Sequence, residues 1–221
     1  MFALTTLLFS LLSLQPLLPD TAADYIEPGQ DEAGFRAWLA SDPTHQARFD
    51  AYGVYLRDAG VADVVPLWQL TRTASDWNKC AQPAFEVPPV TLWPGIVDTL
   101  RYTKEAVLPA VGAVEVLSTY RNPYLNSCAG GSARSVHRNN QELDMVPRYP
   151  IARAELMSRL CTVHARYGRR YDAGFGFYSG IRFHVDTWSY RAWGISAAEG
   201  GDQCRIALDR REAARADPND G

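Results

Sequence analysis

Two short stretches of the chain carry side chains that could bind a metal ion. The first holds His137 and Asp144, and the second, further along the chain, holds His184 and Asp186. A neutral imidazole and an ionised carboxylate are ordinary zinc ligands, and a catalytic zinc takes three protein ligands and leaves a fourth position for water. His137, Asp144 and His184 would supply such a set.

The first stretch must bend for its two candidate ligands to meet. Asp144 follows His137 by seven residues, which on an uninterrupted helix would be about 10 Å along the axis, too far for one small ion. Asn139 and Asn140 lie between them and favour a turn. We therefore expect a loop carrying His137, then a turn, then a short strand over residues 142–145 in which Asp144 faces back toward His137.

The second stretch has the composition of a strand. Residues 183–187 are aromatic or β-branched around His184 and Asp186, and a glycine-rich segment, 174–178, precedes them. Side chains at i and i+2 of a strand share a face. We expect His184 to be a ligand and Asp186, on the same side, to be a base or an orienting carboxylate. Either pair alone is more often structural, but two of the four histidines lie in these stretches.

The remaining pattern predicts an α+β fold. Apolar residues recur at helical spacing over residues 31–74 and 152–167. We expect a small antiparallel sheet with helices on one face, an N-terminal helical extension, and the ligands on the opposite, open face. The strands of this sheet are predicted at residues 114–120, 142–145, 172–178 and 182–187.

Composition limits the function classes. The chain has 221 residues, 47% of them hydrophobic, with a net charge of −3 and no continuous basic patch. These values suit one globular domain with extra elements and give no electrostatic case for nucleic acid. We expect a monomer.

The N-terminus and the cysteines predict export. Residues 2–18 are almost wholly apolar and lead to the small residues Thr21, Ala22 and Ala23, so we favour a cleaved signal peptide over residues 1–23, with membrane contact only if it stays uncleaved. Four widely spaced cysteines then predict two disulfides in an oxidising compartment such as the periplasm or cell envelope, with three pairings open. They are Cys80, Cys128, Cys161 and Cys204.

Three motifs together resemble the zinc D-Ala-D-Ala carboxypeptidase family, which has the hedgehog/D,D-peptidase fold. They are Ser118-Thr-Tyr-Arg-Asn-Pro-Tyr-Leu-Asn, then Ser135-x-His-x6-Asp, and a downstream segment with Tyr178, His184, Asp186, Arg191 and Trp193. The match covers about residues 88–194.

The resemblance implies an exported zinc peptidase acting on D-alanyl peptides of peptidoglycan, as a carboxypeptidase or a cross-link endopeptidase. Arg121, at a strand end, would hold the substrate carboxylate bidentately. Ser135 would either bind substrate or cap the turn. Asp186 would accept a proton from the zinc-bound water. The implied domains are a helical extension at 24–87, the peptidase-like domain at 88–205 and a flexible tail at 206–221.

The chain also departs from the family pattern. Asn140 and Glu142 stand where the family usually has Gly and Ala, and Trp188 stands where it has Gly. Many members carry an acidic general base three residues before the last ligand, where this chain has Ile181. Either Asp186 takes that role or catalysis is impaired, which leaves a zinc-containing module that binds peptidoglycan or protein as the alternative.

Overall fold

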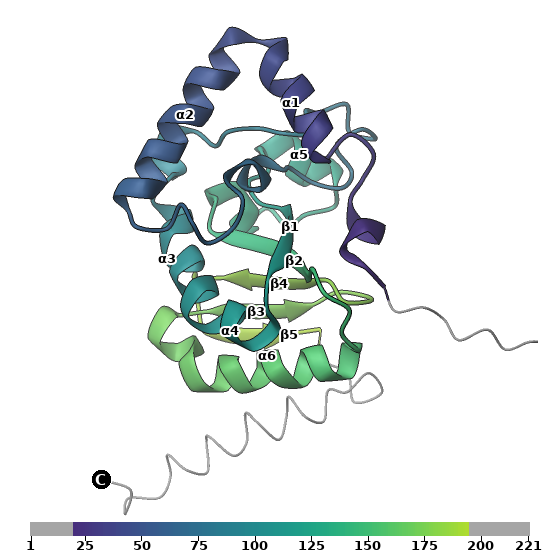
Figure 1. The fold of residues 1–221 in the computed structure, drawn as a ribbon, viewed down its shortest axis with the longest axis vertical. Helices are drawn as coiled ribbons and strands as arrows, with labels where there is room; N and C mark the ends of the chain where they lie inside the picture. The colour runs from purple at the N-terminus through teal and green to yellow at the C-terminus, as the bar shows by residue number, and fades with distance from the viewer. Residues whose placement is uncertain (1–19, 195–221) are drawn as a thin grey trace, which may run out of the picture.

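A computed structural model describes residues 20–194 of the chain, an α+β arrangement around a five-stranded mixed sheet (Figure 1). The strands are β1 (Val114–Ser118), β2 (Glu142–Pro147), β3 (Gly174–Phe177), β4 (Phe183–Asp186) and β5 (Arg191–Trp193), in the spatial order β1-β2-β4-β3-β5. Neighbours from β1 to β3 are antiparallel, whereas β5 runs parallel to β3. The four predicted strands are confirmed, but the purely antiparallel sheet is wrong because of β5.

The helices of the described residues are mostly short segments. They are α1 (Glu32–Ser41), α2 (Pro43–Asp58), α3 (Gly95–Tyr102), α4 (Leu108–Val111), α5 (Pro123–Cys128) and α6 (Arg153–Tyr167). A π-helical segment, Thr103–Val107, joins α3 to α4. Short 3-10 helices occur at Ala22–Tyr25, Leu67–Thr71, Val90–Leu92, Val136–Asn139 and Gly168–Tyr171.

The predicted helical region at residues 31–74 is wrong beyond Asp58. The Asp42 carboxylate accepts a hydrogen bond from the Thr44 amide, which caps α2 at its first turn. After α2 ends, Gly60 adopts φ +73°, a left-handed conformation that turns the chain away. Only the 3-10 helix Leu67–Thr71 follows before residue 74.

The two faces of the sheet are chemically different because strand side chains alternate. One face carries the apolar side chains that form the hydrophobic core with α3, α4 and α6: Leu143, Met145, Phe175, Phe177, Phe183 and Val185. Figure 1 shows α6 running along one side of the sheet. The intervening residues on β2 and β4 are Glu142, Asp144, His184 and Asp186, all buried, so the polar site and the core lie on opposite faces as predicted.

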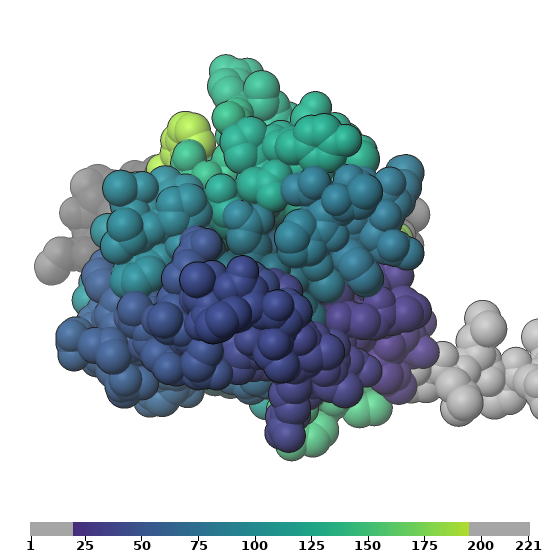
Figure 2. Space-filling model, turned by 90° about the horizontal axis from the view of Figure 1, so that it is seen from above, coloured from purple at the N-terminus to yellow at the C-terminus, as the bar shows by residue number. Residues whose placement is uncertain are grey.

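The N-terminal helices share this core. Tyr52, Leu56 and Val61 belong to the same hydrophobic cluster as the sheet residues. Figure 2 views the end of the molecule where α1 and α2 lie and shows them packed against later segments of the chain. The free edge of β1 is covered as well, because the Val116 amide donates to the Gln69 side-chain oxygen Oε1 at 3.0 Å and the Thr119 amide donates to the Arg72 carbonyl at 3.0 Å.

A buried ion pair reinforces that contact. The Arg72 guanidinium donates to Glu115 Oε1 at 2.8 Å through Nη1 and to the Gln30 carbonyl at 2.7 Å through Nε. Both charged side chains are almost fully buried. Arg72 thereby ties the segment around Gln30 to β1, the strand that leads to the site.

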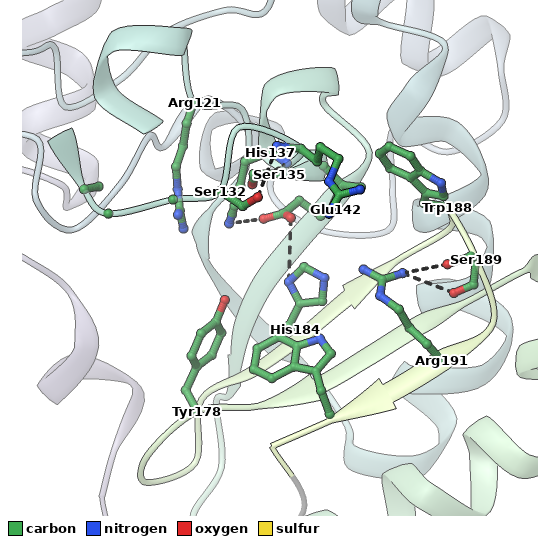
Figure 3. A pocket seen from close by; sticks show the side chains of 16 residues that line it. Arg121, Ser132, Ser135, His137, Glu142, Tyr178, His184, Trp188, Ser189 and Arg191 are labelled. Carbon is green, nitrogen blue, oxygen red and sulfur yellow. Dashed lines mark hydrogen bonds and ion pairs between the residues drawn. The ribbon is translucent and has the colours of Figure 1, made fainter. Parts of the chain in front are cut away.

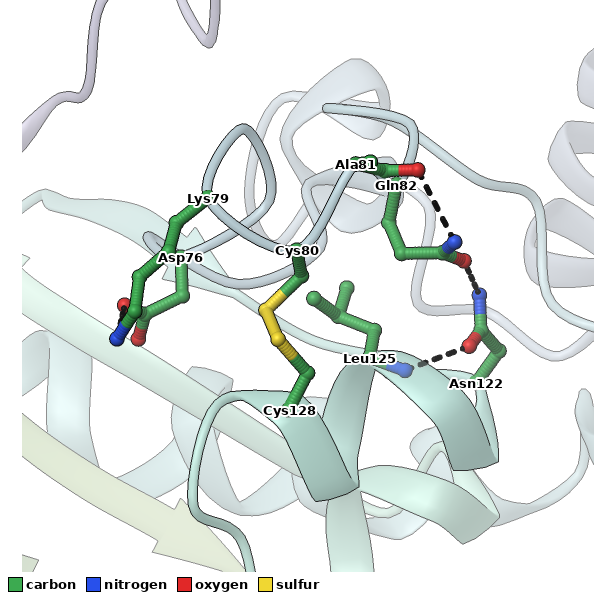
Figure 4. Close-up of a disulfide and its surroundings, with 8 residues drawn as sticks. All are labelled: Asp76, Lys79, Cys80, Ala81, Gln82, Asn122, Leu125 and Cys128. Carbon is green, nitrogen blue, oxygen red and sulfur yellow. Dashed lines mark hydrogen bonds and ion pairs between the residues drawn. A yellow bond between two sulfur atoms is a disulfide. The ribbon is translucent and has the colours of Figure 1, made fainter.

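A disulfide joins Cys80 to the last residue of α5, Cys128 (Figure 4). The Asn122 side chain adds a second link, because its amide nitrogen donates to Gln82 Oε1 and Glu86 Oε2, each at 3.0 Å. Cys80–Cys128 is thus one of the three pairings left open by the sequence, and the second predicted disulfide involves Cys204, which lies outside the described residues. A disulfide is consistent with an exported protein.

Some predictions fall outside the described part of the chain. These are the tail at 206–221 and the predicted signal peptide except for residues 20–23. Within residues 20–194, none of the helices has the length and apolar character needed to cross a bilayer.

Candidate metal centre

Strand pairing brings the predicted ligands together. Asp144 on β2 and His184 on β4 are direct cross-strand partners, and Glu142 and Asp186 are the next pair on the same face. His137 comes from the 3-10 helix Val136–Asn139. Asn140 then adopts φ +53°, which reverses the chain into β2. The predicted loop, turn and strand are therefore confirmed.

A hydrogen-bond acceptor behind each imidazole fixes which ring nitrogen faces the site. His137 Nδ1 lies 2.6 Å from the Thr119 carbonyl oxygen, which only accepts, so Nδ1 carries a proton and Nε2 presents a lone pair. His184 Nε2 lies 2.7 Å from Asp186 Oδ2 and donates to it, which leaves Nδ1 to face the site. Such acceptors behind histidines are typical of metal centres.

The two ring nitrogens that face the site and the carboxylates of Glu142 and Asp144 converge on one point. His184 Nδ1 lies 3.2 Å from Asp144 Oδ1 and 3.7 Å from Glu142 Oε2, and His137 Nε2 lies 3.4 Å from Asp144 Oδ2 and in close contact with Glu142 Oε1. One ligand atom from each of the four residues lies within 4.8 Å of the others. Figure 3 shows the Glu142 carboxylate reaching toward both imidazoles.

This convergence of lone pairs suits a cation. His137 Nε2 and Glu142 Oε1 are buried and have no hydrogen-bond partner, and orphaned buried donors of this kind are costly unless something positive lies between them. The set of two imidazoles and two carboxylates is chemically suited to a divalent metal. The cluster could therefore hold a metal ion.

The two imidazoles have opposite electrostatic environments. Burial and the nearby Arg121 charge lower the pKa of His137 to about 3, so this ring stays neutral. Burial disfavours the charged form of His184, but the Glu142 carboxylate and the hydrogen bonds to Asp144 and Asp186 outweigh it and raise the pKa of His184 to about 10. Metal binding at Nδ1 would displace that proton.

The two carboxylates have opposite environments. Burial raises the pKa of Glu142 well above its ordinary value. Burial acts in the same direction on Asp144, but the Arg182 charge and the hydrogen bonds to the two imidazoles outweigh it and hold the pKa of that carboxyl well below its ordinary value. Asp144 Oδ2 accepts from Arg182 Nη2 at 2.6 Å and from Arg121 Nη2 at 2.9 Å. Asp144 is thus the firmly ionised member of the pair.

Arg121 and Ser135 line the site, but each already has a structural contact. The Arg121 guanidinium bonds Asp144 through Nη2 and Ser118 Oγ through Nε at 3.0 Å. Ser135 Oγ accepts from the His137 amide at 3.4 Å and so caps the 3-10 helix. The capping role expected as one alternative for Ser135 is present, and its side chain also faces the pocket.

Asp186 lies behind His184, away from the convergence point. Its Oδ2 accepts from His184 Nε2 and from Arg191 Nη2, both at 2.7 Å. Its Oδ1 accepts from the Trp188 amide at 2.9 Å and Arg191 Nη1 at 3.0 Å. Burial opposes ionisation, but these hydrogen bonds prevail and lower the pKa of Asp186. Of the two roles expected for Asp186, this geometry favours the orienting carboxylate over the base.

Sequence reasoning did not select Glu142 or Arg182. Glu142 was seen only as a departure from a family pattern, although the i, i+2 rule that pairs His184 with Asp186 also puts Glu142 on the face of Asp144. Ile181, where many family members have an acid, packs in the hydrophobic core.

The convergence point opens into a cavity of about 810 Å³. Three arginines line it (Arg121, Arg134 and Arg191), as do three aromatic residues (Tyr178, Trp188 and Trp193). Smaller residues complete the wall: Ala129, Gly130, Gly131, Ser132, Ser135, Val136 and Ser189. His137, His184 and Glu142 also line it, and Glu142 is the only acid among the lining residues that belong to 20–194. Asp144 and Asp186 do not line it.

The glycine-rich strand β3 makes room for this wall. A Cβ on Gly176 would lie 2.0 Å from the Trp193 ring, and one on Gly174 would lie 2.2 Å from Asp186 Oδ2. Glycine at both positions lets Trp193 and the Asp186–Arg191 pair pack directly on the strand.

Comparisons with protein-family models, with curated proteins and with solved structures found no match to this chain.

Proposed function

We propose that this protein is an exported zinc-dependent peptidase that hydrolyses D-alanyl peptides of peptidoglycan, as a carboxypeptidase or a cross-link endopeptidase. The observation that carries the proposal is the convergence of lone pairs from His137, Asp144 and His184 beside a large open cavity. The motif resemblance supplies the substrate class, and the disulfide supports export to an oxidising compartment.

Zinc would be held by His137 Nε2, His184 Nδ1 and the Asp144 carboxylate. When bound, it supplies a Lewis acid and a water of lowered pKa. The protein's own contribution is to hold these donors in place: Thr119 and Asp186 orient the two rings. Arg121 and Arg182 orient and ionise Asp144.

The cavity suits an anionic peptide. Arg121, Arg134 and Arg191 all line it, and guanidinium groups bind carboxylates in a planar, often bidentate geometry. Arg121 retains Nη1, which neither the Asp144 contact nor the Ser118 contact uses. A substrate carboxylate bound there would bring its scissile carbonyl toward the metal position, as hydrolysis requires.

The proposal is tested by measuring metal content and hydrolysis together. Purified protein should bind about one zinc ion and release product from peptides ending in D-Ala-D-Ala or from cross-linked wall peptides. His137→Ala and His184→Ala should each lose the metal and the activity, because one of three ligands is removed. His45→Ala, which changes a half-buried histidine on α2 outside the cluster, should lose neither.

The alternative is a wall-binding or protein-binding module that keeps the metal without catalysis. It is favoured by the burial of Ile181 in the core and by the saturated hydrogen bonding of Asp186, since neither position supplies a base. Zinc-loaded wild type that sediments with peptidoglycan but cleaves neither class of peptide would establish the alternative.

A further inference from the structure

We propose that Glu142 is the proton acceptor of the hydrolytic reaction, while Asp144 is the anionic metal ligand. The role assigned to Glu142 rests on the proposed function, because a proton acceptor is needed only if water is the nucleophile. It adds a catalytic residue that the family resemblance does not supply.

The two carboxylates on β2 share a face but differ in what holds them. Asp144 Oδ2 is held by Arg121 and Arg182, so this carboxylate is fixed in place beside the two imidazoles. The contacts of the Glu142 carboxylate within residues 20–194 are with the two imidazoles, and no guanidinium bonds it. Glu142 is therefore the carboxylate of this pair that no guanidinium neutralises.

Position separates them further. Glu142 lines the cavity, and Asp144 does not. A substrate and an attacking water must arrive from the cavity, so the carboxylate on that side is the one that meets them. A general base has to lie within hydrogen-bond reach of the proton that it removes, and Glu142 is the acid that satisfies this requirement.

The other acids are excluded by their own contacts. Asp186 faces the far ring nitrogen of His184, and four hydrogen bonds occupy its two oxygens. Asp144 is bonded by two guanidinium groups. Ile181 offers no proton acceptor at all.

The reaction is hydrolysis of an amide bond by water. Water transfers a proton to a Glu142 oxygen as its own oxygen bonds the carbonyl carbon of the substrate. Glu142 then returns that proton to the amide nitrogen as the C–N bond breaks, which yields a carboxylic acid and an amine. No oxidant, reductant or further reactant is required.

The test compares Glu142→Gln with wild type by zinc affinity and by turnover. Glutamine keeps the shape and removes the proton acceptor, so we expect zinc stoichiometry to stay at the wild-type value and affinity to fall by less than about tenfold, while turnover falls about 10²–10⁴-fold. Asp144→Asn should instead lose the metal. Glu155→Gln, the same change at an exposed position on α6, should alter neither readout.

A second variant guards against a local packing defect. Glu142→Ala introduces the residue usual in the resembling family, and it should bind zinc, lose turnover, and recover at least tenfold when formate is added as an external proton acceptor. Absence of rescue in a folded, zinc-loaded variant would contradict the role.

Two results for Glu142→Gln would overturn the proposal. Loss of zinc from Glu142→Gln as complete as that from Asp144→Asn would make Glu142 a metal ligand and overturn the proposal. Wild-type turnover in zinc-loaded Glu142→Gln would overturn it as well. If zinc-loaded wild type cleaves no peptide, the proposed function itself fails, and the role of Glu142 fails with it; the wild-type measurement alone identifies this case.

Discussion

Replacing Asp186 by asparagine separates an orienting carboxylate from a catalytic base. Each Asp186 oxygen accepts two hydrogen bonds: Oδ1 from the Trp188 amide and Arg191 Nη1, and Oδ2 from His184 Nε2 and Arg191 Nη2. Asparagine has one acceptor oxygen and one NH₂ group. In either amide orientation, the NH₂ group would face two donors, so two hydrogen bonds are lost.

The magnitude follows from these contacts. Loss of the group that orients a metal-bound histidine costs about 10–100-fold in metal affinity, or about 1.4–2.7 kcal/mol. The two lost hydrogen bonds should also lower the free energy of unfolding of the metal-free protein by about 2–4 kcal/mol. In either orientation one of the two lost bonds comes from Arg191, whose side chain is 38% exposed. Water can replace that contact, which favours the lower value.

The assay is zinc affinity by competition with a chromophoric chelator, followed by turnover at saturating zinc. We expect Asp186→Asn to bind zinc more weakly but to turn over within about tenfold of wild type once loaded. Asp172→Asn is the matched control, since Asp172 is exposed with φ +48°, a conformation that asparagine also tolerates. Wild-type zinc affinity combined with a 10²–10⁴-fold loss of turnover would refute this reasoning and make Asp186 the base.

Two further predictions concern the scaffold. Replacing both Cys80 and Cys128 by serine should lower the free energy of unfolding by about 4 kcal/mol, since the disulfide closes a loop with a sequence separation of 48; a denaturant titration showing less than about 1 kcal/mol would contradict this. Arg72→Ala should cost about 3–5 kcal/mol because it leaves Glu115 buried without its close partner, and thermal unfolding beside the exposed control Arg36→Ala measures it.

The sheet and the ligands were predictable because their signals are local. Alternation and glycine-rich flanks mark residues 142–145 and 183–187 as strands, and the i, i+2 rule then puts His184 and Asp186 on one face. Asn139 and Asn140 mark the turn that returns Asp144 toward His137. The structure agrees with each of these predictions.

The parts that were missed depend on long-range contacts. Strand β5 has three residues, and its pairing with β3 is not encoded in its own pattern. The apolar periodicity after residue 58 reflects packing on a shared core rather than continuing helix. Arg121 precedes Asp144 by 23 residues, so its bond to a candidate ligand could not be read from the sequence. Glu142, by contrast, was accessible to the i, i+2 rule and was missed because three ligands already completed the expected set.

The cross-strand position of the ligands makes the metal a check on sheet register. Asp144 faces His184 directly across β2 and β4, and a slip of one residue would turn every side chain of one strand to the opposite face. Leu143 or Val185 would then stand where a ligand is needed. A misregistered sheet could not assemble the ligand set, so metal binding would stabilise only chains that have paired their strands correctly. The ion would therefore act during folding as well as in the finished site, because its binding would shift the equilibrium toward the correct strand register.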